Sequence, residues 1–136
     1  MTLSRTTEYA LQTLAFMARA QDTTFSCSRL HRTLHIPNKY LQHILTNLTK
    51  RGLVSSGRGR AGGYRLGRSP RKIYLSEIIE ATEEFEREPR CFFGFGSCPL
   101  DNPCAMHEVW AKAHERLVTQ LSRTRLSDLV AGAKGR

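Results

Sequence analysis

The sequence predicts a mainly α-helical fold with one small β-hairpin and a long helix near the C-terminal end. Apolar residues recur every three or four positions in several stretches, which is the pattern of helices that bury one face. Two short runs, 53–56 and 64–66, flank a glycine-rich segment as the strands of a hairpin do. The longest periodic stretch comes last, between Pro103 and Arg123.

Three helices are expected before the hairpin. Residues 3–20 form the first, and Ser26 is a suitable N-cap for a short second helix. Pro37 is expected at the first position of the third helix, with Gly52 just after its end. The apolar stripe of the first helix contains Tyr9, Ala10, Leu14, Met17 and Ala18, and that of the third contains Leu41, Ile44, Leu45 and Leu48.

Two further helices are expected after the hairpin. One runs from Tyr74 to about Phe85, a loop over 86–102 follows, and Asn102 and Pro103 begin the last helix. A domain of this size does not need so long an extra apolar stripe, so we expect this helix to pack on its copy in a two-fold dimer. Packing within the chain is the alternative. The stripe contains Met106, Val109, Trp110, Ala113, Leu117 and Leu121.

A helix, a short helix, a proline-initiated helix and a basic hairpin, in this order, are the parts of a winged helix-turn-helix. We therefore expect a winged helix-turn-helix DNA-binding domain at 1–85, a cysteine-rich loop at 86–103, and a dimerisation helix with a C-terminal tail at 104–136. In this fold the third helix enters the major groove of DNA and the hairpin forms the wing.

The charge distribution also indicates a polyanionic partner. The chain carries 21 Lys and Arg against 12 Asp and Glu, a formal net charge of +9. Residues 23–76 contain eleven Lys or Arg and no Asp or Glu, whereas a solvated surface normally mixes both signs. We expect duplex DNA as the partner. The expected contact residues are Arg29, Asn38, Lys39, Tyr40, Gln42, His43, Asn47, Lys50, Arg51, Arg58, Arg60 and Arg65.

The sequence argues against a membrane protein and against an enzyme. No apolar run approaches the roughly 20 residues of a membrane span. Glu8, Gln12 and Thr13 interrupt the one segment that resembles a signal peptide, so we expect a cytoplasmic protein without membrane contact. No nucleophile–base pairing and no metalloprotease or deaminase motif occurs, so we expect no catalytic residues and no small-molecule substrate.

Three of the four cysteines, Cys91, Cys98 and Cys104, fall within 14 residues, and His107 follows them. In a reducing compartment such clusters are more often metal ligands or redox thiols than disulfides. Cys104 and His107 share one face of the last helix because they are three residues apart. Thiolates with one imidazole suit an iron–sulfur cluster or zinc, although the short paired intervals of structural zinc sites are missing. Cys27 stands alone, and a packing role is expected for it.

Together, in their order along the chain, several motifs resemble the Rrf-type family of bacterial winged-helix regulators, which includes IscR, NsrR and RirA. The resemblance covers nearly the whole chain. It rests on Leu3-Ser4-Arg5-Thr6-Thr7-Glu8-Tyr9-Ala10-Leu11, Ile36-Pro37 with Tyr40-Leu41, Gly52-Leu53-Val54-Ser55-Ser56, Arg58-Gly59 with Gly62-Gly63-Tyr64 and Leu66, the three cysteines with His107 and Trp110, and Leu126-Ser127-Asp128-Leu129-Val130.

The resemblance implies a homodimeric transcription factor, often a repressor, with an iron–sulfur cluster whose state sets its affinity for operator DNA. Cys91, Cys98 and Cys104 match the family's cysteine ligands. His107 matches the fourth ligand of IscR-like members, which hold a two-iron cluster. Glu8 lies where NsrR-like members use a carboxylate of the partner subunit on a four-iron cluster. We expect the two-iron cluster, with the four-iron cluster as the alternative.

The sequence departs from IscR-like members in two ways. One extra residue separates Cys91 from Cys98, and Gln42 replaces a Glu that helps to read DNA in those members, so their operator sequence is not carried over. In our hypothesis the cluster orders residues 86–104 and fixes the dimer helix relative to the DNA-binding domain. Oxidation, nitric oxide or iron shortage then shifts the population of DNA-competent dimers.

Two other functions stay open at this point. One is a regulator of the same fold that senses by thiol oxidation or by zinc, without a cluster. The other is an iron–sulfur carrier or small redox protein with an incidental basic face.

Overall fold

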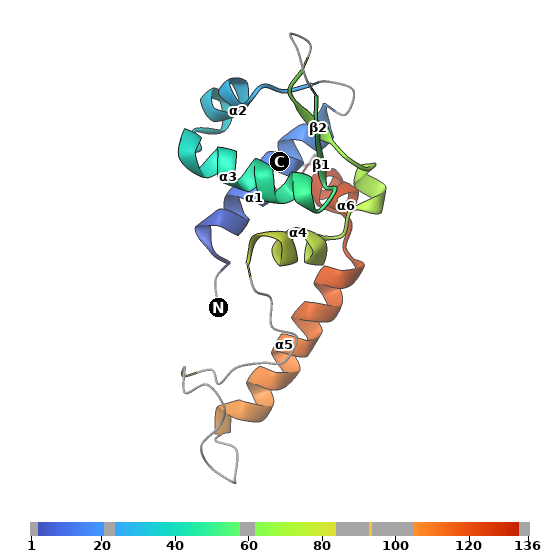
Figure 1. The fold of residues 1–136 in the computed structure, drawn as a ribbon. Helices are drawn as coiled ribbons and strands as arrows, with labels where there is room; N and C mark the ends of the chain where they lie inside the picture. The colour runs from blue at the N-terminus through green and yellow to red at the C-terminus, as the bar shows by residue number, and fades with distance from the viewer. Residues whose placement is uncertain (1–2, 21–23, 58–61, 84–92, 94–104, 134–136) are drawn as a thin grey trace.

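A computed structural model describes residues 3–20, 24–57, 62–83, 93 and 105–133. It confirms the predicted fold class, since the described part is mainly helical with one two-stranded antiparallel hairpin. Most elements form one body, from which a long helix projects (Figure 1). In chain order the elements are α1 Arg5–Arg19, α2 Cys27–Leu34, α3 Asn38–Lys50, β1 Val54–Ser56, β2 Tyr64–Leu66, the 3-10 helix η1 Pro70–Lys72, α4 Leu75–Thr82, α5 Ala105–Arg123 and α6 Leu126–Ala133.

Local capping explains where the first helices begin and end. The side chain of Ser4 accepts a hydrogen bond from Thr7 N–H at the start of α1, and Ser26 accepts one from Arg29 N–H at the start of α2, as predicted. Gly52 follows α3 with a φ of 73°, a conformation that glycine adopts without a Cβ penalty. The prediction for Pro37 was wrong by one residue, because its extended ψ of 133° makes it the N-cap, and α3 begins at Asn38.

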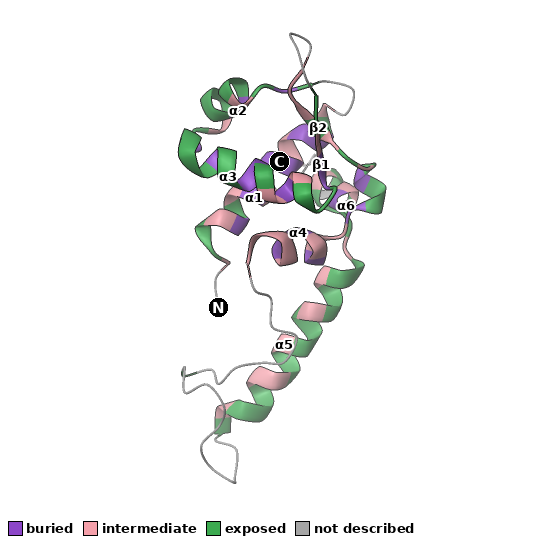
Figure 2. Ribbon diagram, viewed as in Figure 1, coloured by how far each residue is buried: buried purple, intermediate pink, exposed green. Residues whose placement is uncertain are grey.

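The predicted apolar stripes of α1 and α3 form much of the core. All four predicted apolar residues of α3 are fully buried. In α1 only Tyr9 departs from the expectation, since it is half-buried while the other four are buried. Helix α4 adds the buried pair Ile78 and Ile79, and Phe25 and Ile36 fill the space beside α2. Buried residues therefore gather where α1, α3, α4 and α6 meet (Figure 2).

The hairpin matches the predicted strands, and its second strand also pairs with the backbone of Phe25. Val54 pairs with Leu66 and Ser56 with Tyr64 in antiparallel register. Backbone hydrogen bonds of 2.8 Å and 2.6 Å also join Phe25 to Tyr64 in both directions. Gly63 has a φ of 151°, and a Cβ there would lie 2.7 Å from the carbonyl oxygen of Phe25, so only glycine fits this approach. Residues 58–61 of the predicted turn lie outside the described part of the chain.

The C-terminal segment is more than the tail that the sequence suggested. Residues 126–133 form α6, which packs against α1 and η1. Leu126 is fully buried, and its N–H donates to the carbonyl of Ile73 at 2.8 Å. In the same short bridge, Leu75 N–H donates to the carbonyl of Thr124 at 2.9 Å. After α5 the chain therefore packs on the body again through α6.

Helix α5 projects from the body, and none of its residues is buried. Two members of its predicted apolar stripe are strongly exposed, Val109 at 60% and Leu117 at 51%. The stripe is therefore only partly covered in one chain, since Met106, Trp110 and Leu121 are half-buried and α5 also contacts α4. Among the described helices, none has the length and apolar character needed to cross a membrane.

Truncating Leu126 is expected to destabilise the body. Leu126→Ala removes a fully buried side chain and should lower the free energy of unfolding by about 2–5 kcal/mol in chemical denaturation at fixed protein concentration. Leu129→Ala in the same helix is the matched control, since Leu129 is 40% exposed and should cost clearly less. Equal effects of the two variants would contradict the packing of α6 on the body.

Candidate nucleic-acid interface and cysteine site

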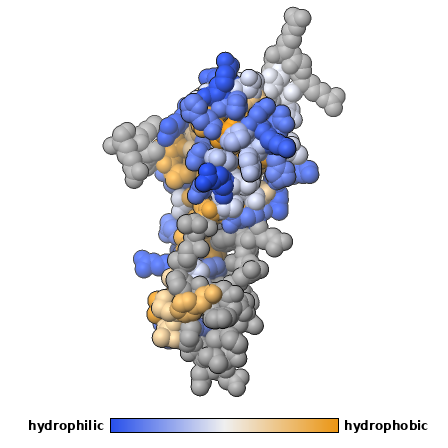
Figure 3. All heavy atoms as spheres, turned by 90° about the vertical axis from the view of Figure 1, so that its left-hand side faces the viewer, coloured by the Kyte–Doolittle hydropathy of each residue, from blue (hydrophilic) through white to orange (hydrophobic). Residues whose placement is uncertain are grey.

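Helix α3 exposes a polar face because its apolar face is buried in the core. Four residues on one side of α3 are buried, so the helical period turns the remaining side chains outward. Polar side chains dominate this side of the body (Figure 3). Five predicted contact residues of α3 are exposed, namely Asn38, Lys39, Tyr40, Gln42 and His43. This arrangement matches a recognition helix that is free to enter a groove.

Contacts within the chain orient several of these side chains. The ring of Tyr40 meets the ring of Tyr9 edge to face, with centroids 6.2 Å apart. The amide nitrogen of Asn47 lies 3.3 Å from Nε2 of His43, one helical turn away. These contacts join the recognition helix to α1 and reduce the freedom of its outer face.

The other predicted DNA contacts fall into three groups. Lys50 on α3 and Arg65 on β2 are exposed. Arg29 on α2 is also exposed, and its guanidinium lies 4.8 Å from the ring centroid of Phe25, a cation–π contact that holds it over this ring. Arg51 donates a long hydrogen bond of 3.4 Å to the carbonyl of Glu80, so one of its hydrogen-bond donors is engaged within the fold. Arg58 and Arg60 lie outside the described residues.

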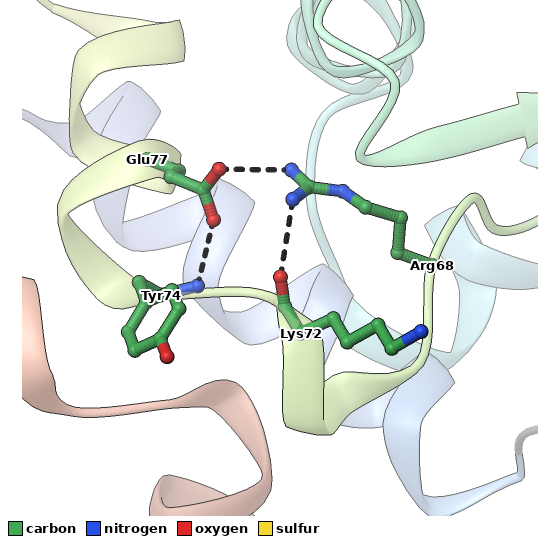
Figure 4. A network of polar contacts seen from close by, with 4 residues as sticks. All are labelled: Arg68, Lys72, Tyr74 and Glu77. Carbon is green, nitrogen blue, oxygen red and sulfur yellow. Dashed lines mark hydrogen bonds and ion pairs between the residues drawn. The ribbon is translucent and has the colours of Figure 1, made fainter.

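One basic residue of the carboxylate-free segment has a structural role. Arg68 forms an ion pair with Glu77 at 3.1 Å and donates to the carbonyl of Lys72, also at 3.1 Å. The other oxygen of Glu77 accepts from Tyr74 N–H at 2.9 Å, which caps α4 (Figure 4). Arg68 therefore secures the chain between the hairpin and α4, in agreement with its absence from the predicted DNA contacts.

Cys27 behaves as the packing residue that the sequence indicated. Its side chain is partly buried against the core, and its thiol donates to Oδ1 of Asn38 at 3.3 Å. Burial raises the pKa of the Cys27 thiol, which disfavours the reactive thiolate. The contact links the start of α2 to the start of the recognition helix.

Of the candidate metal ligands, the structure describes only Glu8 and His107, since Cys91, Cys98 and Cys104 lie outside the described residues. Both side chains are exposed. Glu8 lies in the first turn of α1, whereas His107 lies near the far end of the projecting α5 (Figure 1). One chain therefore does not bring the two alternative ligands together. Within the described ranges, no three His, Cys, Asp or Glu residues gather into a metal site.

A hydrogen-bond network that the sequence did not reveal joins α1 to the end of α4. The buried hydroxyl of Thr7 donates to Oε2 of Glu83 and lies 2.7 Å from the hydroxyl of Thr82. The backbone N–H of Ser4 donates to the same carboxylate oxygen at 3.1 Å. Glu83 directly precedes the segment that holds the cysteines, so this network connects that segment's origin to the turn of α1 that carries Glu8. No local sequence signal marks a contact between residues so far apart.

The network lowers the pKa of Glu83 below its ordinary value of 4.5. Burial alone raises the pKa, but the hydrogen bonds from Thr7 and Ser4 to the ionised carboxylate outweigh it. A group with a lowered pKa in the folded state stabilises the fold above its unfolded pKa, and this contribution is lost as the pH falls through the folded value.

The stability of the Glu83→Gln variant should therefore depend less on pH than that of the wild type. We expect the wild type to be the more stable protein at neutral pH, by up to about 1 kcal/mol because the carboxylate is partly exposed. The difference should shrink below pH 4.5. Denaturation curves across this range measure it, and the exposed Glu115→Gln variant is the control with the same charge change. A difference that stays constant with pH would refute the assignment.

A winged helix-turn-helix body with an exposed basic recognition helix defines a class of DNA-binding transcriptional regulators. The chain belongs to the Rrf2 family, whose model is described as an iron-dependent transcriptional regulator and matches residues 3–132. The related proteins are regulators, not enzymes.

Individual relatives agree with this assignment. Over 91 residues, 67% of this chain, it is 40% identical to the HTH-type transcriptional regulator IscR of Klebsiella pneumoniae (strain 342), and the match spans 55% of that protein. The structure of CymR, the global cysteine regulator of B. subtilis, superposes with a TM-score of 0.82 at 26% identity, covering 96% of this chain and 97% of CymR. T. potens IscR gives a TM-score of 0.78 at 26% identity, covering 99% and 90%.

Proposed function

We propose that this chain is a homodimeric, cytoplasmic transcriptional repressor whose affinity for operator DNA is set by an iron–sulfur cluster. The observation that carries DNA binding is the geometry of α3, which buries its apolar face completely and exposes Lys, Asn, Gln and His side chains. The family's description as iron-dependent and the clustered cysteines support the cluster.

The exposed side chains of α3 divide into two chemical roles. The amide of Gln42 can pair with adenine through two hydrogen bonds, because it offers one donor and one acceptor side by side. Lys39 and Lys50 are exposed cations that suit phosphates or guanine. Arg65 on the hairpin is exposed beside the wing turn, where a minor-groove or phosphate contact is within the repertoire of the fold.

Two substitutions separate these roles. Lys39→Gln should weaken binding to all duplexes alike and reduce the slope of log affinity against log salt by about 1. Gln42→Ala should cost about 1–3 kcal/mol on the operator and relax base discrimination. Lys112→Gln on α5, whose charge pairs with Glu108 at 3.0 Å, is the control and should change neither. Fluorescence anisotropy at several salt concentrations measures all three, and unchanged binding by both α3 variants would exclude α3 as the reading element.

A dimer explains the uncovered apolar stripe of α5. Val109 and Leu117 lie on the same side of the helix as Trp110 and are exposed in one chain. Packing two such helices together buries these side chains, and the two recognition helices then reach major grooves about 34 Å apart. In a dimer, α1 of one chain can also lie near α5 of the other, so that Glu8 and His107 of different chains are both candidates for the fourth ligand.

A charged residue in the stripe should break the dimer. Leu117→Lys places an ammonium in the proposed interface and should weaken dimerisation by about tenfold or more. Glu115→Lys lies on the opposite face of α5 and should leave the dimer intact. Sedimentation velocity over a concentration series distinguishes them, and a wild-type monomer at all concentrations would refute the dimer.

The residues proposed to hold the cluster are Cys91, Cys98 and Cys104, with His107 or Glu8 as the fourth ligand. Three soft thiolates suit iron, and both candidate fourth ligands are exposed and able to coordinate. If Glu8 is the fourth ligand instead of His107, it comes from the partner subunit, as the resemblance to NsrR-like members implies. When bound, the cluster would supply a redox- and nitric-oxide-sensitive centre.

Anaerobic isolation tests the cluster directly. We expect iron and acid-labile sulfide in equal amounts, with a visible absorption band, and their amount per chain distinguishes two-iron from four-iron forms. Cys98→Ala should abolish the cluster and remove the difference in operator affinity between loaded and stripped wild-type protein. Absence of iron and sulfide even after reconstitution would instead favour a thiol- or zinc-dependent regulator, while leaving the DNA-binding proposal intact.

A further inference from the structure

A basic pocket lies between the end of α1, η1 and the start of α6. Its volume is about 620 Å³, within the range of about 300–1,000 Å³ typical of small-molecule sites. None of the described residues that line it belongs to α2, to α3 or to the hairpin. DNA binding by α3 therefore does not account for it. The described residues that line the pocket are Ala18, Arg19, Ser69, Pro70, Arg71, Ser127, Val130 and Ala131.

The lining has the chemistry of an anion site. Arg19 comes from the last turn of α1 and Arg71 from η1, so two arginines from separate elements line the pocket. No acidic residue lies among the described lining residues, and none of the described carboxylates forms an ion pair with either arginine. Two cations that have no counter-ion among the described residues and line one pocket repel each other, and an anion between them removes that cost.

Two serine hydroxyl groups and the N-terminal turn of α6 complete the polar lining of the pocket. The Ser69 oxygen accepts from Arg71 N–H at 3.3 Å, which leaves its own O–H available as a donor. Ser127 lies in the first turn of α6, where the helix dipole contributes partial positive charge. Against these groups, the buried Ala18 and Pro70 and the half-buried Val130 provide a small apolar floor.

We propose that this pocket binds a small organic anion, with its carboxylate or phosphate oxygens on Arg19 and Arg71 and its apolar part on Ala18, Pro70 and Val130. Guanidinium groups pair with both kinds of oxyanion through two parallel hydrogen bonds. The ligand bridges α1, η1 and α6. Because α6 continues directly from α5, occupancy stabilises the attachment of the long helix to the body. The site is independent of the cysteines and of the cluster.

Titration with inorganic phosphate and with malonate, each at constant ionic strength, tests the site on the full chain. Calorimetry and amide chemical shifts should show saturable binding of one probe per chain, with shifts at residues 18–19, 69–71 and 127–131. Preference for phosphate or malonate identifies the oxyanion. Arg19→Gln and Arg71→Gln should each weaken binding by about tenfold or more. Arg32→Gln, an exposed arginine on α2 outside the pocket, should bind as the wild type does.

Three results would overturn the proposal. The first is a linear response without saturation, which indicates general ionic screening. The second is an equal loss of binding in Arg32→Gln. The third is unchanged probe binding in Arg19→Gln and Arg71→Gln together with weaker duplex binding, which assigns these arginines to the DNA backbone. Thermal unfolding confirms that the variants are folded, and both arginines are exposed, so neither substitution opens the core.

Discussion

The burial of one face of α3 is the constraint on which the rest of the structure depends. Leu41, Ile44, Leu45 and Leu48 are fully buried against the core that α1 and α4 share. Four fully buried aliphatic side chains contribute roughly 1.5–3 kcal/mol each, far more than any single surface contact of this helix. Rotating α3 about its axis would expose them, so the outward direction of Gln42 and His43 is held by packing on the opposite side.

The same logic explains why polar contacts here position elements instead of driving the fold. Arg68 and Glu77 are each about one-third exposed, so their ion pair alone stabilises little. The ion pair instead fixes the position of the chain, because it joins Arg68, which follows β2, to the residue that caps α4. The bonds of Glu83 to Thr7 and Ser4 likewise relate α1 to the origin of the cysteine segment. The network therefore links the end of α4 to α1, a helix that packs on α3.

Helix α5 differs from α3 because part of its apolar face is exposed in one chain. A helix that buries none of its residues gains little from packing on its own chain, and most helical stability in proteins comes from packing of an apolar face. In the proposed dimer, the exposed Val109 and Leu117 would be covered by the identical surface of a two-fold copy. Helix α6 packs on the body after α5 and lines a basic pocket to which no described residue of α3 contributes.

Periodicity and charge in the sequence determined the fold class, the stripes of α1 and α3, the hairpin strands and the exposed cations of α3, because these depend on neighbours within one or two helical turns. Only the tertiary structure decided that Pro37 caps α3 instead of starting it, that 126–133 return as α6, and that Thr7 bonds Glu83. It also separated Glu8 from His107 within one chain. These contacts and separations involve residues that are far apart in the chain. A local sequence pattern does not indicate which distant residues the packing brings together.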